Sequence, residues 1–207
     1  MSGKATSLSF VARHSLWSEE QNEAAVRLRR IVEEKGLDTI RLSFPDQHGI
    51  LRGKTLVASE ALRILESGCS ITTTMLAKDT SHRTVFPVFT AGGGFGMTEM
   101  QGAADVLMIP DPMTFRVLPW APTTGWILCD VHFADGRPVP FATRGLYKSV
   151  LKKLSARGYD FVARLEVEFH VFKVNDPKMQ PWHAGQPGEP PDVSLLSHGS
   201  QYPTQPR

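Results

Sequence analysis

The chain lacks several features that mark particular classes of protein. Its 207 residues include only two cysteines, Cys69 and Cys129, which lie far apart and form no metal-binding or redox motif, as is usual in a reducing compartment. The formal net charge of +2 gives no electrostatic reason to expect nucleic-acid binding. No apolar run approaches the length of a membrane span, and residues 1–17 lack the continuous apolar core of a signal peptide. We therefore expect a soluble, cytoplasmic protein with no nucleic-acid or membrane partner.

Phosphate-binding loops of known spacing are missing as well. Residues 49–55 have three residues between two glycines where a P-loop has four, and the glycine run at 92–96 does not fit the dinucleotide-binding pattern. No serine or cysteine stands in a readable local arrangement with a histidine and a carboxylate. The glycine run belongs to a long segment, residues 77–103, with little periodicity. Such a segment is either a turn-rich loop or a flap on the substrate side of a site.

The remaining pattern predicts alternating helices and strands. Ser18 with Gln21 forms a capping box at the start of a helix that Gly36 ends. Strands at 39–44 and 50–57 flank a turn, as in a hairpin. Further elements are expected as a helix at 60–66 capped by Ser59, strands at 70–76, 105–109 and 125–133, and a helix that Thr143 caps and Gly158 ends.

The segment from residue 164 to 172, R-L-E-V-E-F-H-V-F, alternates between apolar and polar side chains. In a strand it would place Glu166, Glu168 and His170 together on one face, opposite an apolar face. Two carboxylates this close repel each other unless a cation joins them, and carboxylate oxygens suit magnesium or manganese. The alternative is a half-exposed strand whose polar face is solvated.

Two other regions allow more than one interpretation. Asp46 lies at the tip of the predicted hairpin, where an aspartate normally caps the turn. After Asn175 the chain becomes proline-rich and loses its apolar periodicity, which is typical of a loop or a disordered segment. A chain that stops in such a stretch, soon after a strand of metal-ligand type, is expected to be a fragment or a truncated product.

Taken together, the ordered segments resemble the amino-terminal part of the glutamine synthetase family, in particular its branch of γ-glutamyl-amine ligases. The resemblance covers about residues 20 to 175. Its segments are F-P-D-Q-H-G-I-L-R-G-K, D-V-L-M-I-P-D-P-M-T-F-R-V-L-P-W, G-W-I-L-C-D-V and L-E-V-E-F-H-V-F, in that order.

The resemblance implies an α+β fold in which a small β-grasp domain precedes a catalytic domain. We expect a flexible tail at 1–17, a helix at 18–36, the β-grasp domain at 37–136 and the incomplete start of the catalytic domain, with its proline-rich tail, at 140–207. The family forms its site between the catalytic sheet of one subunit and the β-grasp domain of a neighbour. A homo-oligomeric ring is therefore expected of the full-length form.

The resemblance also assigns roles to three residues. Glu166 and Glu168 match the strand glutamates that each ligate one of two divalent cations, Mg²⁺ or Mn²⁺, which hold ATP during phosphoryl transfer to glutamate. Asp46 matches a hairpin aspartate that helps to bind and deprotonate ammonium. His170 stands where better-known members carry an aromatic residue, and we interpret it as a neighbour of the metal site. The activity implied is an ATP-dependent ligation of glutamate to ammonia or an amine, as in glutamine biosynthesis and nitrogen metabolism.

Two departures from the family pattern limit this interpretation. Residues 72–103 lack the usual aspartate-glycine-serine-serine loop and are longer, so ammonia is not assured as the amine. The further metal ligands, ATP contacts and substrate arginines of the family would lie beyond Arg207, so the chain alone is expected to be inactive. Two alternatives stay open, namely a non-catalytic β-grasp interaction module that assembles with full-length subunits and a metal-binding remnant. The sequence does not identify the amine or the acyl substrate.

Overall fold

The computed structural model describes residues 8–175 and 191–196 of the chain. These residues fall into two compact units, Met1–Gly158 and Tyr159–Arg207, which we describe separately. The predicted proline-rich tail lies mostly outside the described residues. None of the helices in the described ranges has both the length and the apolar character needed to cross a membrane.

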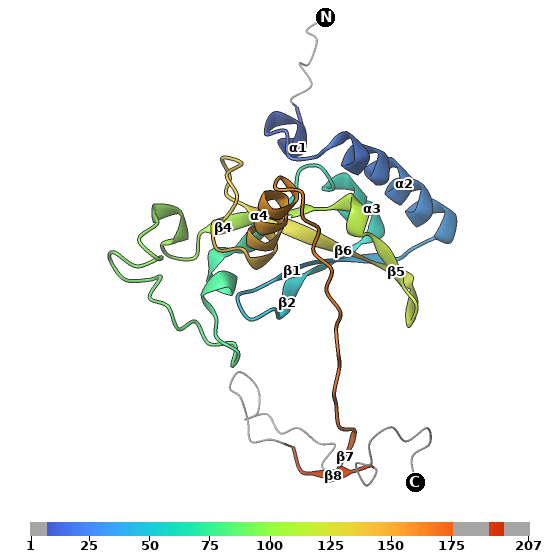
Figure 1. Cartoon of the computed structure of the whole chain (residues 1–207), viewed down its shortest axis with the longest axis vertical. Helices are drawn as coiled ribbons and strands as arrows, with labels where there is room; N and C mark the ends of the chain where they lie inside the picture. The colour runs from blue at the N-terminus through green and yellow to red at the C-terminus, as the bar shows by residue number, and fades with distance from the viewer. Residues whose placement is uncertain (1–7, 176–190, 197–207) are drawn as a thin grey trace, which may run out of the picture. The chain divides into compact units, whose positions relative to one another are not determined.

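A mixed β-sheet forms the centre of the first unit (Figure 1). Its strands follow the order β2-β1-β6-β4-β3, and β5 pairs with one end of β6. The pairs are antiparallel except for β1 with β6, which run parallel. The strand bounds are β1 Thr39–Pro45, β2 Leu51–Val57, β3 Cys69–Thr72, β4 Asp105–Pro110, β5 Arg116–Leu118 and β6 Ala121–His132. The predicted hairpin is confirmed, because Thr39 pairs with Val57 and Pro45 with Leu51.

The long helix α2, Glu19–Lys35, has the termini that the sequence predicts. The Ser18 side chain accepts a hydrogen bond from the Gln21 N–H, and the Gln21 side chain accepts one from the Ser18 N–H. At the other end Gly36 adopts a left-handed conformation, which costs glycine least. The shorter helices of this unit are α1 Phe10–Arg13, α3 Ala58–Arg63, η1 Thr73–Ala77, η2 Thr98–Met100 and η3 Pro112–Thr114.

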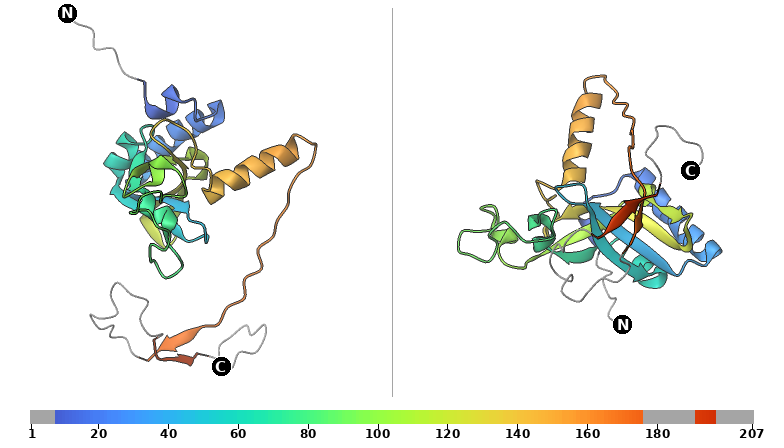
Figure 2. Two further views of the ribbon diagram at one scale, coloured as in Figure 1. Left: turned by 90° about the vertical axis from the view of Figure 1, so that its left-hand side faces the viewer. Right: turned by 90° about the horizontal axis from the view of Figure 1, so that it is seen from below.

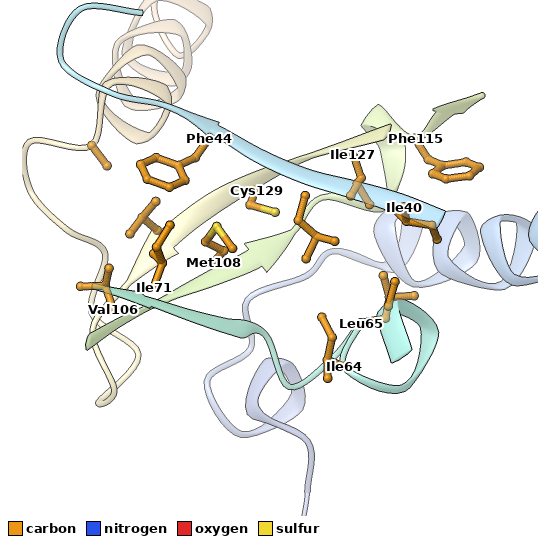
Figure 3. Packing of buried hydrophobic residues seen from close by; sticks show 14 of the residues in the cluster. Ile40, Phe44, Ile64, Leu65, Ile71, Val106, Met108, Phe115, Ile127 and Cys129 are labelled. Carbon is orange, nitrogen blue, oxygen red and sulfur yellow. The ribbon is translucent and has the colours of Figure 1, made fainter. Parts of the chain in front are cut away.

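The core lies between this sheet and the helices α2 and α3 (Figure 3). Apolar residues at alternate positions of β1, namely Ile40, Leu42 and Phe44, are almost completely buried. They pack in the same cluster as Leu28 from α2 and Leu65, which follows α3. Burial of these side chains, roughly 1.5 to 3 kcal/mol for each large apolar residue, is the main force that holds the helices on the sheet.

Three segments differ locally from the sequence expectation. Within residues 8–17, expected to belong to a tail, α1 buries Phe10 and Val11. The strand expected at 70–76 ends at Thr72 because the chain turns into η1. Helix α3 begins at Ala58, directly after β2, without a side-chain cap.

The last helix of the unit, α4 Thr143–Ser155, stands out from the sheet and has no buried residue (Figure 2). A charged network holds its first turn. The Nη2 atom of Arg144 lies 2.5 Å from Asp111 Oδ2, and Arg144 also pairs with Asp130 of β6. Lys148 adds a second cation, with its Nζ 2.8 Å from Asp130 Oδ2. Because the Arg144 side chain is only 16% exposed, loss of either partner would leave a poorly solvated charge.

In the second unit the predicted strand at 164–172 is wrong for the described structure. Residues 159–171 form neither helix nor strand, and β7 covers only Phe172–Val174. Within this unit β7 pairs with β8, Val193–Leu195, and the side chains of both are exposed. A strand needs a neighbour that pairs its backbone groups. In the described part of this unit, β7 and β8 pair only with each other, and residues 159–170 have no such neighbour.

Candidate functional site

The Asp46 carboxylate organises the tip of the β1–β2 hairpin. Its Oδ1 atom accepts hydrogen bonds from the backbone N–H groups of His48, at 2.9 Å, and Ile50, at 3.0 Å. Its Oδ2 atom accepts a hydrogen bond from Arg52 Nε at 2.9 Å and lies 2.8 Å from Arg52 Nη2 in an ion pair. Asp46 is 1% exposed. Both carboxylate oxygens of Asp46 therefore have hydrogen-bond donors within the protein.

The electrostatics of Asp46 follow from these contacts. Burial pushes the pKa of the Asp46 carboxyl upward, but the hydrogen bonds from the His48 N–H and the Arg52 guanidinium outweigh it. The pKa of Asp46 consequently lies below its ordinary value. An ionised carboxylate that accepts backbone N–H bonds two and four residues ahead matches the turn-capping interpretation of this aspartate.

Two elements from elsewhere in the chain fasten this hairpin tip. The Thr143 hydroxyl at the start of α4 donates to the backbone carbonyls of Pro45 and Asp46, at 3.1 and 3.2 Å. Thr143 is the first residue of α4, and its hydroxyl links the helix to the hairpin. The prediction that Thr143 caps this helix is wrong.

The second link comes from the long segment between η1 and η2. The Arg52 Nη1 atom lies 2.6 Å from His82 Nδ1. A guanidinium only donates, so His82 accepts through Nδ1 and its ring proton resides on Nε2. His82 has a positive φ of 63°, which is uncommon for a residue other than glycine. Hydrogen bonds from Ser81 and Arg83 N–H to the Asp79 carboxylate hold this turn.

The residue after Asp46 carries unsatisfied polar atoms. Both Nε2 and Oε1 of Gln47 are buried and have no hydrogen-bond partner within the described residues. A buried amide without partners costs roughly 1 to 3 kcal/mol. Gln47 is therefore a group that a bound molecule could satisfy, and it offers one donor and one acceptor face.

The two predicted metal ligands belong to the second unit. Glu166 and Glu168 are exposed and lie in the extended segment 159–171. His170, their predicted neighbour, has its ring 6.2 Å from that of Phe172. Over the described ranges, no three histidine, cysteine, aspartate or glutamate side chains come together as a metal site would require. The oxygen donors of the two glutamates fit a hard cation by their chemistry, but they form only part of a coordination sphere.

Sequence reasoning missed Arg52, His82, Gln47 and Thr143 as parts of this region. Only Arg52 carried a usable signal, because it lies six residues after Asp46 in a predicted hairpin and so near the same tip. The contacts of His82 and Thr143 join residues 30 and 97 positions apart, which no local pattern indicates.

Curated proteins, but no protein-family model, match the chain. It is 40% identical over 201 residues to γ-glutamylanilide synthase of an Acinetobacter species, which covers 94% of this chain and 40% of that protein. It is 33% identical over 184 residues to γ-glutamylethanolamide synthetase GlnA4 of Streptomyces coelicolor, which covers 85% of this chain and 38% of that protein. The resemblance to the glutamine synthetase family is confirmed.

Other members of this family are similar over shorter stretches or at lower identity. Glutamate–isopropylamine ligase of a Pseudomonas species is 28% identical over 188 residues. Among solved structures, the apo form of GmaS aligns with a TM-score of 0.47 and 31% identity, over 61% of this chain and 25% of that chain. The chain spans about two fifths of the length of the curated relatives it matches.

Proposed function

We propose that this chain is part of an ATP-dependent ligase that joins the γ-carboxyl group of glutamate to an amine. The observation that carries the proposal is the 40% identity over 201 residues to a γ-glutamylanilide synthase. The names of the relatives include anilide, ethanolamide, isopropylamine and methylamine products or substrates, and also glutamine synthetases. This range supports the ligase class and leaves the amine open.

The reaction proposed has two steps. The γ-carboxylate of glutamate takes the terminal phosphoryl group of ATP, which leaves ADP and a γ-glutamyl phosphate. The amine nitrogen then attacks the γ-carbonyl carbon, the bond from that carbon to the phosphate oxygen breaks, and the nitrogen loses a proton. Glutamate, amine and ATP thus give the γ-glutamyl amide, ADP and phosphate. Catalysis of this kind depends on positioning and on stabilisation of the charge on the phosphates.

Glu166 and Glu168 are proposed as ligands of divalent cations, Mg²⁺ or Mn²⁺. When bound, such ions would neutralise phosphate charge. The chemistry of the two carboxylates supports this role, and further ligands would have to come from outside the described residues, since magnesium prefers about six oxygens. The 207 residues by themselves are accordingly predicted to form no γ-glutamyl product.

A catalytic role for Asp46, in binding and deprotonating the amine, stays a prediction of the family resemblance. Its contacts support a different role, because both oxygens of this carboxylate already accept hydrogen bonds from Arg52 or backbone amides, and Asp46 is only 1% exposed to an incoming amine. The Asp46→Asn variant distinguishes the catalytic role from the turn-capping role. Loss of a catalytic base lowers kcat about 100-fold or more, whereas loss of a turn cap lowers the melting temperature and leaves the activity of the folded fraction.

The architecture proposed is a β-grasp domain at 37–136 followed by the start of a catalytic domain at 140–207. The mixed sheet with α2 and α3 packed in its core supports the first part. A homo-oligomeric ring in the cytoplasm is part of the same proposal and follows from the family alone.

The proposal is tested on the complete gene product that contains this chain. ADP release is measured with glutamate, Mg²⁺ and a panel of amines, and the γ-glutamyl amide is identified by mass spectrometry. Glu166→Gln and Glu168→Gln should each lower the rate on the order of 100-fold or more, because they remove a ligand charge without a change of size. Asp160→Asn, an exposed carboxylate of the same segment, is the matched control and should keep the wild-type rate.

Binding of Mn²⁺, followed by electron paramagnetic resonance, gives a second readout that does not need turnover. Both glutamine variants should weaken it and Asp160→Asn should not. Near-normal activity of either variant at limiting Mg²⁺ would show that the ligand assignment is wrong. Absence of ADP release with every amine would remove the ligase proposal and favour the interaction module or the remnant.

A further inference from the structure

Three phenylalanine rings form an aromatic cluster at the surface of the first unit. The Phe86 and Phe95 ring centroids are 4.9 Å apart, and those of Phe95 and Phe141 are 5.0 Å apart. Phe141 is partly buried and packs against the core, whereas Phe86 is 47% and Phe95 43% exposed. Exposed aromatic rings that gather in one place commonly mark a binding surface, while single exposed apolar residues do not.

The backbone at Phe95 favours a functional interpretation of this cluster. Phe95 has a φ of 59°, between Gly94 at 72° and Gly96 at 73°. A left-handed conformation costs a residue with a side chain about 1 to 2 kcal/mol, so glycine would be the unstrained choice at all three positions. Strained residues of this kind concentrate at binding and active sites, where the surrounding structure holds them in place.

The cluster is connected to the hairpin of the candidate site by two short stretches of chain. Phe141 lies two residues before Thr143, whose hydroxyl binds the carbonyls of Pro45 and Asp46. The segment that carries Phe86 and Phe95 is fastened to the same hairpin by the contact between His82 and Arg52. In Figure 1 this segment extends to one side of the sheet, between η1 and β4.

The chemistry around the hairpin distinguishes between classes of amine. An ammonium or alkylammonium ion arrives charged and needs a carboxylate that binds it and takes its proton. The buried carboxylate at this hairpin, Asp46, is already bound by Arg52 and two backbone amides. An arylamine is weakly basic and uncharged at neutral pH, and its ring can stack on other rings at centroid distances like those within the cluster.

We infer that the aromatic cluster recognises the amine substrate and selects a primary aromatic amine. The inference rests on the proposed ligase function and adds the substrate class and the residues that select it. Phe86 and Phe95 offer exposed ring surface to the amine, and Phe141 fixes the position of Phe95 from beneath.

The test compares amines on the complete gene product. Phe95→Ala should lower kcat/KM for aniline about fivefold to tenfold, which is the energy of one aromatic pair, and should lower kcat/KM for methylamine less, because methylamine has no ring to stack. Phe95→Leu keeps apolar volume without a ring and should show a similar loss for aniline. Phe89→Ala is the matched control, since Phe89 belongs to the same segment, is 71% exposed and is not part of the cluster.

A binding measurement separates failure of this inference from failure of the ligase proposal. Fluorine NMR of a fluorinated aniline added to the complete gene product should show line broadening with wild type and Phe89→Ala, and much less with Phe95→Ala. If no amine supports ADP release but this pattern holds, the cluster still binds arylamines and only the ligase proposal is lost. If the fluorinated aniline does not bind, the inference is wrong.

Two further outcomes would also overturn the inference while the ligase proposal stands. One is an equal loss for aniline and methylamine in Phe95→Ala. The other is a change in sedimentation that shows loss of self-association in Phe95→Ala with the amine preference unchanged, which would make the cluster a subunit contact.

Discussion

Strand β1 and the segment 165–171 have the same sequence pattern, but only β1 forms a strand with a buried apolar face. Both alternate apolar with polar side chains. In β1 the apolar residues Ile40, Leu42 and Phe44 are at most 2% exposed. In the later segment Leu165, Val167 and Phe169 are at least 64% exposed and no strand forms. Alternation therefore indicates which residues could share a face, but it does not decide whether that face is buried.

The neighbours of each segment explain the difference. Strand β1 lies between β2 and β6, which pair its backbone on both sides, and its apolar face meets the helices of the core. Within the second unit, residues 159–170 have no strand beside them among the described residues. An unpaired extended segment gains neither ladder hydrogen bonds nor apolar burial to offset the entropy of ordering it.

The largest effect expected is in the charged network that holds α4. Arg144→Ala removes the cation that lies between Asp111 and Asp130 and should destabilise the first unit by about 3 to 5 kcal/mol. Urea unfolding followed by tryptophan fluorescence gives the measurement. Lys148→Ala, which removes a more exposed cation of the same network, is the control and should cost about 1 kcal/mol or less. Equal losses for the two variants would contradict the role assigned to burial.

Two leucine-to-alanine variants, one in each segment, test directly whether the apolar face of each segment is buried. Leu42→Ala, in β1, should cost about 2 to 5 kcal/mol, because it leaves a cavity in a packed core. Leu165→Ala removes the same atoms from an exposed position and should change stability by about 0.5 kcal/mol at most. A large loss for Leu165→Ala in the same urea titration would mean that the later segment is buried in solution and that its alternation has the same meaning as in β1.

The smallest effect concerns pH. Burial raises the pKa of Asp46 and Asp111, but their hydrogen bonds and arginine partners outweigh it, so both values are lowered in the folded chain. Their stabilisation is present above the unfolded pKa, about 4, and is lost as the pH falls through the folded value. The free energy of unfolding should drop by about 1 to 3 kcal/mol in acid, measured by urea titration from neutral pH downward.

Asp46→Asn should flatten this acid dependence, because the amide does not titrate. The variant should also be less stable at neutral pH than wild type, since it loses the ion pair with Arg52. An acid profile of Asp46→Asn identical to that of wild type would show that Asp46 does not contribute to it.

The sequence predicted much of the first unit because its signals are local. The capping box at Ser18 and Gln21, the left-handed Gly36 and the β1–β2 hairpin each depend on residues close together in the chain, and each is confirmed. Element ends were less predictable. Ser70–Leu76 has strand-like composition throughout, yet only Cys69–Thr72 pairs with β4, and the chain then turns into η1.

By itself, the sequence determined most element types of the first unit, the relationship to the glutamine synthetase family and the carboxylates that could ligate a metal. Only the tertiary structure decided which strands pair, with β1 parallel to β6, and which charges are buried, with Arg144 between two aspartates. It also decided that Asp46 is bound by Arg52 and that the glycine-rich segment presents Phe86 and Phe95. The reason is physical. Propensity and periodicity act over a few residues, whereas burial and ion pairing depend on groups that meet only when distant parts of the chain pack together.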